Sequence, residues 1–78
     1  MQRFHFNIRD GQVIEDPSGE TLPDRRAAQS AAIAILSEIL PKRLDDLLPE
    51  GRLSIDVTDD AGDLVFSVLT TVAVHQGA

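Results

Sequence analysis

The feature that most constrains this chain is the layout of its apolar residues. Two short segments in which apolar and polar residues alternate, each folding back at a glycine-containing turn, flank one alanine-rich segment with helical spacing. Alternation with a period of two is typical of strands, whereas apolar residues three and four positions apart are typical of a helix. The order ββαββ therefore predicts an α+β fold, with a four-stranded, mainly antiparallel sheet and one amphipathic helix packed on one face.

The first alternating segment covers residues 3–9 and predicts a strand. Its apolar members, which we expect to face the core, are Phe4, Phe6 and Ile8. Asp10-Gly11 follows, which is a strong hairpin signal because glycine tolerates a positive φ. We expect residues 12–15 to return as a second strand, with Val13 or Ile14 pointing inward. A β-turn is then predicted at residues 16–19.

A helix is predicted over about residues 24–40. Asp24 suits the N-cap, because its carboxylate can accept hydrogen bonds from the first free amides. The apolar stripe at helical spacing consists of Ala28, Ala31, Ala32, Ile35, Leu36 and Ile39. Pro41 cannot donate to the carbonyl of Ser37. The helix therefore either ends at Pro41 or kinks there and continues to Leu48, and the sequence leaves both alternatives open.

A third strand is predicted over residues 52–58, a turn at residues 59–62, and a last strand over about residues 64–74. We place the first and third strands in the centre of the sheet. The last strand is apolar on both sides. One side carries Leu64, Phe66, Val68, Thr70, Val72 and Val74, and the other carries Val65, Ser67, Leu69, Thr71 and Ala73. Because a single helix covers only one face of a sheet, the second apolar side indicates a partner.

Size and composition narrow the class of protein. Seventy-eight residues make one small domain, residues 1–78, and such domains are often marginally stable alone. The absence of cysteine excludes disulfides and thiolate zinc sites, which leaves very regular packing or oligomerisation as routes to stability. Of the two we favour oligomerisation. A net charge of −6 argues against nucleic acid as a partner. No apolar run approaches the ~20 residues of a membrane span, so we expect a cytoplasmic protein.

Three short motifs follow one another along the chain. They are Phe4-x-Phe6-x-x-Arg9-Asp10-Gly11, Gly19-x-x-Leu22-Pro23-Asp24 and Ile55-x-Val57-x-Asp59-x-x-Gly62. In this order and spacing the chain resembles a family of small uncharacterised bacterial proteins, a domain of unknown function recurrent in rhizobial and related alphaproteobacterial genomes. The resemblance implies the same fold and a bacterial cytoplasmic setting, and it implies no activity.

One polar cluster is predicted on the outward side of the first strand. It consists of Arg3, His5, Asn7 and Arg9. Such a face can hold an anion or a partner's carboxylate through arginine geometry. The alternative, which we favour, is a solvated strand face with cross-strand pairs.

The densest acidic cluster lies around the second turn and consists of Asp56, Asp59, Asp60 and Asp63. Oxygen ligands can hold Ca²⁺ or Mg²⁺, but the spacing does not match an EF-hand, and a hairpin turn selects the same residue types. A Ser-His-Asp set drawn from Ser54 or Ser67, His5 and Asp10 lacks a nucleophile elbow. We therefore predict no catalytic residue, no metal site and no cofactor.

The sequence thus favours a non-enzymatic interaction domain that self-associates as a homodimer or binds an unknown protein partner. Its expected role is regulatory or adaptor-like. The predicted association surface consists of Ile33, Leu40, Val65, Leu69 and Ala73. Ile33 and Leu40 lie beside the apolar stripe of the helix, so they form either peripheral core or a partner-facing rim. The alternative function is a small-molecule or anion-binding module that uses the outward face of the first strand.

Overall fold

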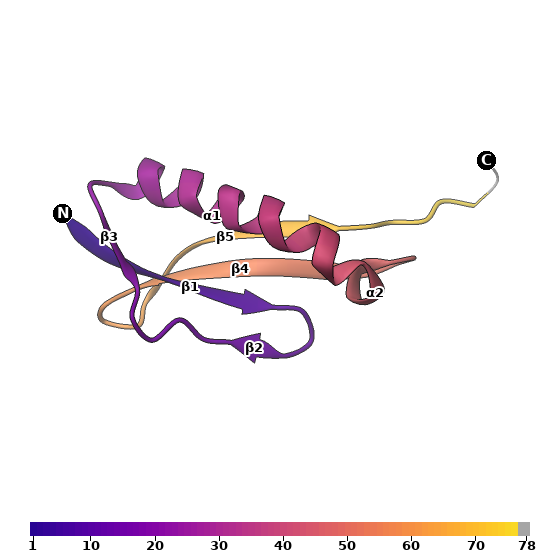
Figure 1. Ribbon diagram of the computed structural model, residues 1–78, viewed down its shortest axis with the longest axis horizontal. Helices are drawn as coiled ribbons and strands as arrows, with labels where there is room; N and C mark the ends of the chain where they lie inside the picture. Colours follow the sequence, from indigo (N-terminus) through magenta and orange to yellow (C-terminus); the bar gives the residue numbers. More distant parts are fainter. Residues whose placement is uncertain (77–78) are drawn as a thin grey trace.

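The computed structural model describes residues 1–76, so the last two residues of the predicted domain, Gly77 and Ala78, lie outside the described residues. The strands of the described chain form one five-stranded antiparallel sheet, and helix α1 (Arg25–Ile39) lies across one of its faces (Figure 1). The predicted α+β fold is confirmed. No helix within residues 1–76 is long and apolar enough to cross a membrane.

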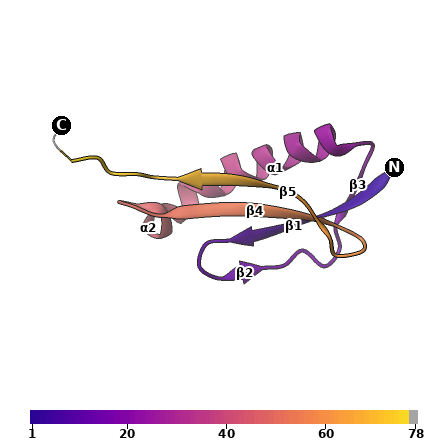
Figure 2. The same ribbon diagram turned by 180° about the vertical axis from the view of Figure 1, so that it is seen from behind.

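The strands in chain order are β1 (Gln2–Arg9), β2 (Val13–Ile14), β3 (Glu20–Leu22), β4 (Arg52–Asp59) and β5 (Leu64–Thr71). β1 and β4 pair in the centre, which confirms the predicted positions of the first and third strands. β5 lies along the other side of β4, while β2 and β3 share the far side of β1 (Figure 2). β3 was not predicted, because three residues are too few to show an alternating pattern.

The second strand is shorter than predicted. Only Val13 and Ile14 pair, opposite Arg9 and Ile8, instead of residues 12–15. The expectation that Val13 or Ile14 points into the core is wrong, since both side chains are exposed. β2 is a border strand, so its apolar side chains lie at the margin of the sheet rather than under the helix.

The helix begins as predicted. The carboxylate of Asp24 accepts a hydrogen bond from the amide of Ala27 at 2.8 Å, which caps the first turn. At Pro41 the chain changes from an α-helix to a 3₁₀-helix, η1 (Leu40–Arg43), and then forms one α-helical turn, α2 (Leu44–Leu47). Of the two alternatives at Pro41, continuation with a change of helix type is the one observed.

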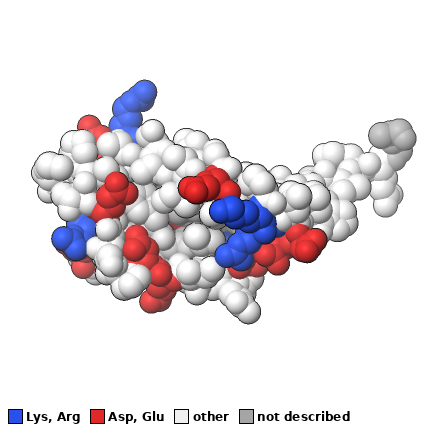
Figure 3. Space-filling view, viewed as in Figure 1, with Lys and Arg blue, Asp and Glu red and all other residues white. Residues whose placement is uncertain are grey.

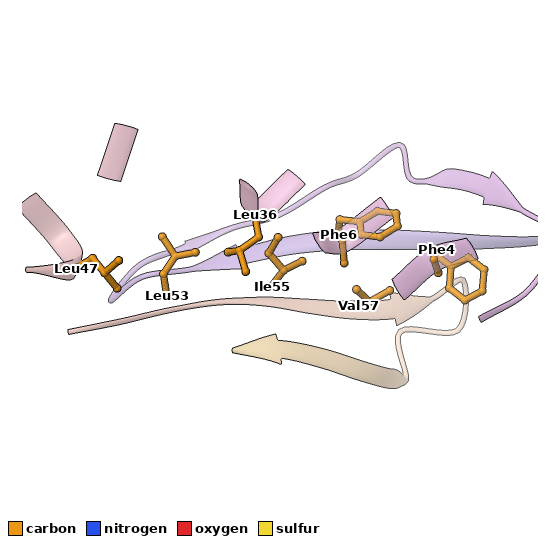
Figure 4. Close-up of a cluster of buried hydrophobic side chains, with 9 residues drawn as sticks. Phe4, Phe6, Leu36, Leu47, Leu53, Ile55 and Val57 are labelled. Atoms are coloured by element: carbon orange, nitrogen blue, oxygen red, sulfur yellow. The ribbon is translucent and has the colours of Figure 1, made fainter. Parts of the chain in front are cut away.

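The core lies between α1 and the sheet. Its buried side chains are Phe4, Phe6, Ala28, Ala32, Leu36, Leu47, Leu53, Ile55 and Val57 (Figure 4). The two phenylalanines come from β1, and Leu53, Ile55 and Val57 come from β4, as the alternation of each strand predicts. The two buried alanines have no side chain beyond Cβ, so they let the helix backbone approach the sheet closely.

The last strand departs from strict alternation at one point. Phe66, Val68 and Thr70 lie opposite the core residues of β4, so they share its helix-facing side. A bulge at the start of the strand pairs Leu64 with Thr58 and packs Val65 against the core, which exchanges the two sides predicted for these residues. The strand ends at Thr71, three residues before the predicted end at Val74.

Candidate functional site

The face of the sheet opposite α1, here called the open face, carries the predicted polar cluster. The register pairs Arg9 with Ser54, Asn7 with Asp56 and His5 with Thr58. Directly paired residues project to the same side of a sheet, so these side chains of β1 and β4 share the open face.

Asp16 organises one end of this face. The amide of Phe6 points away from β4, toward a stretch between β2 and β3, and it donates to Asp16 Oδ2 at 3.1 Å. Asp16 Oδ1 accepts from the amide of Gly19 at 3.1 Å, and the amide of Asp16 donates to Asn7 Oδ1 at 3.0 Å. Desolvation opposes ionisation, but these amides and the neighbouring His5 outweigh it and lower the pKa of the Asp16 carboxyl below its ordinary value. The Asp16 carboxylate thus accepts the hydrogen bond from the Phe6 amide that a neighbouring strand would otherwise accept.

His5 connects this turn to the turn between β4 and β5. Its Nδ1 lies 2.9 Å from the carbonyl oxygen of Asp16, and its Nε2 lies 2.9 Å from Oδ1 of Asp60. Both partners are acceptors, so both contacts are hydrogen bonds only when the ring carries two protons. The hydrogen bond to Asp60, followed by that to the Asp16 carbonyl, raises the pKa of His5 above 6.5.

Gly19 allows the turn to lie directly on β1. Its φ is +71°, and a Cβ at this position would lie 2.9 Å from both Cε1 of His5 and the carbonyl oxygen of Phe4. Both distances are shorter than a van der Waals contact, so a side chain would push the turn away from His5.

The other members of the predicted polar cluster also have partners within the chain. Arg3 donates to the carbonyl oxygen of Ser18 at 2.9 Å, and Arg9 lies 3.2 Å from Asp56 Oδ2. The adjacent hollow, of about 510 Å³, is lined by His5 but also by five acidic residues. These are Glu15, Asp16, Asp56, Asp59 and Asp60. An acidic lining repels anions, which favours the interpretation of a solvated, internally paired face.

Part of the acidic cluster stabilises the turn between β4 and β5. Asp59 Oδ1 accepts hydrogen bonds from the amides of Ala61 at 2.9 Å and Asp63 at 3.0 Å, which closes the turn between β4 and β5. Gly62 occupies the left-handed region with φ +87°. The predicted role in a hairpin turn is confirmed for Asp59, whereas Asp56 lies within β4 and contacts Arg9, and Asp60 contacts His5.

The predicted association residues fall into separate places. Leu40 and Val65 are partly buried against the core, so they contribute to packing rather than to an outer surface. Ile33 is exposed on α1, while Leu69 is exposed on the open face and Ala73 follows β5. Ile33 and Leu69 lie on opposite layers, so they do not belong to one continuous surface.

The outer edge of β5 presents unpaired backbone groups. The amide of Val72 donates to the carbonyl of Gly51 at 2.9 Å, which sets the phase of the β4–β5 ladder. In an antiparallel pair the hydrogen-bonded positions alternate, so the backbone groups of Ser67, Leu69 and Thr71 point away from β4. Within residues 1–76 no strand lies on that outer side.

This edge is also uncharged. Residues 64–74 contain no acidic or basic residue, no proline and no glycine. Leu64 and Leu69 are 63% and 66% exposed, and the chain runs on past the sheet as an extended, uncharged segment (Figure 3). Natural sheets normally protect a long edge with charges, proline or a covering segment. The opposite border is divided between the short strands β2 and β3, so β5 is the long bare edge of the described sheet.

A model of the family described as domain of unknown function DUF6894 matches residues 3–71. The chain belongs to the DUF6894 family. The match extends from β1 to the last residue of β5, so the sheet, the helix and the bare edge are all parts of the DUF6894 domain. Searches of the curated proteins and of the solved structures found no match.

Proposed function

We propose that this DUF6894 domain is a non-enzymatic protein-interaction module that self-associates by adding a strand along the outer edge of β5. The observation that supports the proposal is the outward-facing backbone of Ser67, Leu69 and Thr71 in a long strand without charges. Strand addition obtains its affinity from main-chain hydrogen bonds and its selectivity from alternate side chains. The role that follows is that of an adaptor or regulator in the bacterial cytoplasm.

The alternative of an anion-binding module has weaker support. Arg3, His5 and Arg9 each have an acceptor within the chain, and the neighbouring hollow is acidic. A screen of phosphate, carboxylate and nucleotide ligands by thermal shift separates the two functions. An anion that binds the folded state raises the melting temperature by mass action, whereas a strand-adding domain responds to its own concentration.

Amide hydrogen exchange, measured by NMR from micromolar to millimolar protein, tests the proposal directly. The outward amides of Ser67, Leu69 and Thr71 should gain protection as the concentration rises, in parallel with the molar mass from light scattering. The inward amides of Phe66 and Val68 should be protected throughout, which reports that the domain stays folded.

Ser67→Pro removes an outward N–H without removing a bond to β4, so this variant should fold and fail to associate. Ser67→Ala is the matched control, because both variants lose the 2.8 Å hydrogen bond from Ser67 Oγ to Asp56 but only one loses the amide. If light scattering gave the mass of a monomer at millimolar concentration and the outward amides still exchanged fast, the proposed function would be contradicted.

A further inference from the structure

We infer that the strand added to β5 is β5 of a second copy of this chain, antiparallel to the first, with a two-fold axis at Leu69. The inference rests on the proposed function of the β5 edge and adds the identity, direction and register of the added strand. It commits to an isologous dimer in which the two sheets join into one continuous sheet.

The regular part of β5 fixes the centre of the pairing. After the bulge at Val65, regular pairing with β4 runs from Phe66 to Thr71, and the amide of Val72 continues it to Gly51. Leu69 is the midpoint of residues 66–72, so two-fold pairing there places Phe66 opposite Val72 and Ser67 opposite Thr71. A centre elsewhere leaves part of this regular stretch unpaired or opposes it to the bulge.

The direction in which the backbone groups of β5 point agrees with this centre. Ser67, Leu69 and Thr71 direct their N–H and C=O groups outward, and pairing at Leu69 opposes outward residues to outward residues. A centre between two neighbouring residues would oppose an outward residue to an inward one, so no regular ladder would form.

The side chains brought together are exposed apolar ones. Leu69, 66% exposed, meets its counterpart on the open face. After Thr71 the chain continues as an extended segment past the end of the sheet (Figure 1), and Ala73 lies exposed there. The first half of β5 of the second copy would cover this extension.

Charge favours the antiparallel direction. The acidic turn between β4 and β5 directly precedes β5. Antiparallel pairing at Leu69 places the acidic turns of the two copies at opposite ends of the paired strands. Parallel pairing would instead place the acidic turns, with Asp59, Asp60 and Asp63, beside each other, which like-charge repulsion opposes.

Spin labels on single cysteines test the register, because the natural chain has no cysteine. At ~3.4 Å per residue, a two-fold axis at Leu69 separates the labelled backbones by ~14 Å for Ser67→Cys and ~27 Å for Ala73→Cys. Parallel pairing would give about 5 Å at both positions. A two-fold axis at Ser67 would give about 5 Å and ~41 Å.

Leu69→Lys places two like charges at the axis and should weaken dimerisation by more than about tenfold. Ile33→Lys makes the same change on the opposite layer and should leave dimerisation unaltered, while circular dichroism confirms that both variants fold. A monomer at every concentration contradicts both the proposed function and this inference. A dimer with other label distances, or one that tolerates Leu69→Lys, overturns the inference alone.

Discussion

Arg43 Nη1 lies 2.6 Å from Asp10 Oδ2, and this contact ties the 3₁₀ segment after α1 to the hairpin between β1 and β2. The Asp10 side chain is only 7% exposed. Its other oxygen, Oδ1, accepts from the amide of Gln12 at 3.4 Å. Asp10 therefore has two functions, one within its own turn and one between segments 33 residues apart.

Asp10→Asn should lower the free energy of unfolding by about 1–3 kcal/mol, between the values for exposed and buried ion pairs, because Arg43 loses its charged partner. Urea unfolding measures the change. Asp45→Asn removes an equal charge from an exposed position on α2 and should alter stability by less than about 0.5 kcal/mol. Equal losses in the two variants would show that the Asp10–Arg43 contact does not stabilise the fold.

Gly19→Ala should destabilise the domain by about 1–3 kcal/mol, because alanine is strained at φ +71° and its Cβ would collide with His5 and the Phe4 carbonyl. Gly11→Ala is the matched control: its φ is +104°, but nothing lies within 4 Å of the added Cβ. The loss for Gly19→Ala should therefore exceed that for Gly11→Ala in thermal or urea unfolding. A larger loss at Gly11 would refute the close approach of the turn to β1.

The contacts of His5 predict a pH-dependent contribution to stability. Because the pKa of His5 is raised in the folded state, its contribution is fully present below the unfolded value of 6.5 and is lost as the pH rises through the folded value. The difference in unfolding free energy between the natural chain and His5→Gln should be larger near pH 6 than near pH 8.5. His75→Gln, in the exposed segment after β5, is the matched control. A pH-independent effect of His5→Gln would contradict a doubly protonated ring.

The apolar pattern was sufficient to predict the fold. Phe4 and Phe6 in β1, and Ile55 and Val57 in β4, alternate because each strand has one face on the core, and a period of two survives in the sequence. Their burial also explains why the central positions of these strands could be predicted.

Features that depend on a single extra residue or a single contact left no such pattern in the sequence. One extra residue at the bulge exchanged the sides of Leu64 and Val65, and no residue type marks a bulge here. The pairing of Asp10 with Arg43 joins distant segments, so local spacing does not contain it. Asp16 was predicted only as a turn residue, because the need of the Phe6 amide for an acceptor becomes visible only once β2 and β3 are placed.

Asp16→Ala tests whether that carboxylate substitutes for a strand beside β1. The amides of Phe6 and Gly19 would lose their acceptor, so the free energy of unfolding should fall by about 1–3 kcal/mol. Hydrogen exchange of the Phe6 amide should also accelerate well beyond the global loss of stability, because no neighbouring strand replaces the acceptor. Glu15→Ala, an equal change of charge one residue earlier on an exposed side chain, should leave the Phe6 amide as protected as in the natural chain. If the Phe6 amide exchanged equally slowly in both variants, the segment between β2 and β3 would be held against β1 by other contacts, and Asp16 would be only a turn residue.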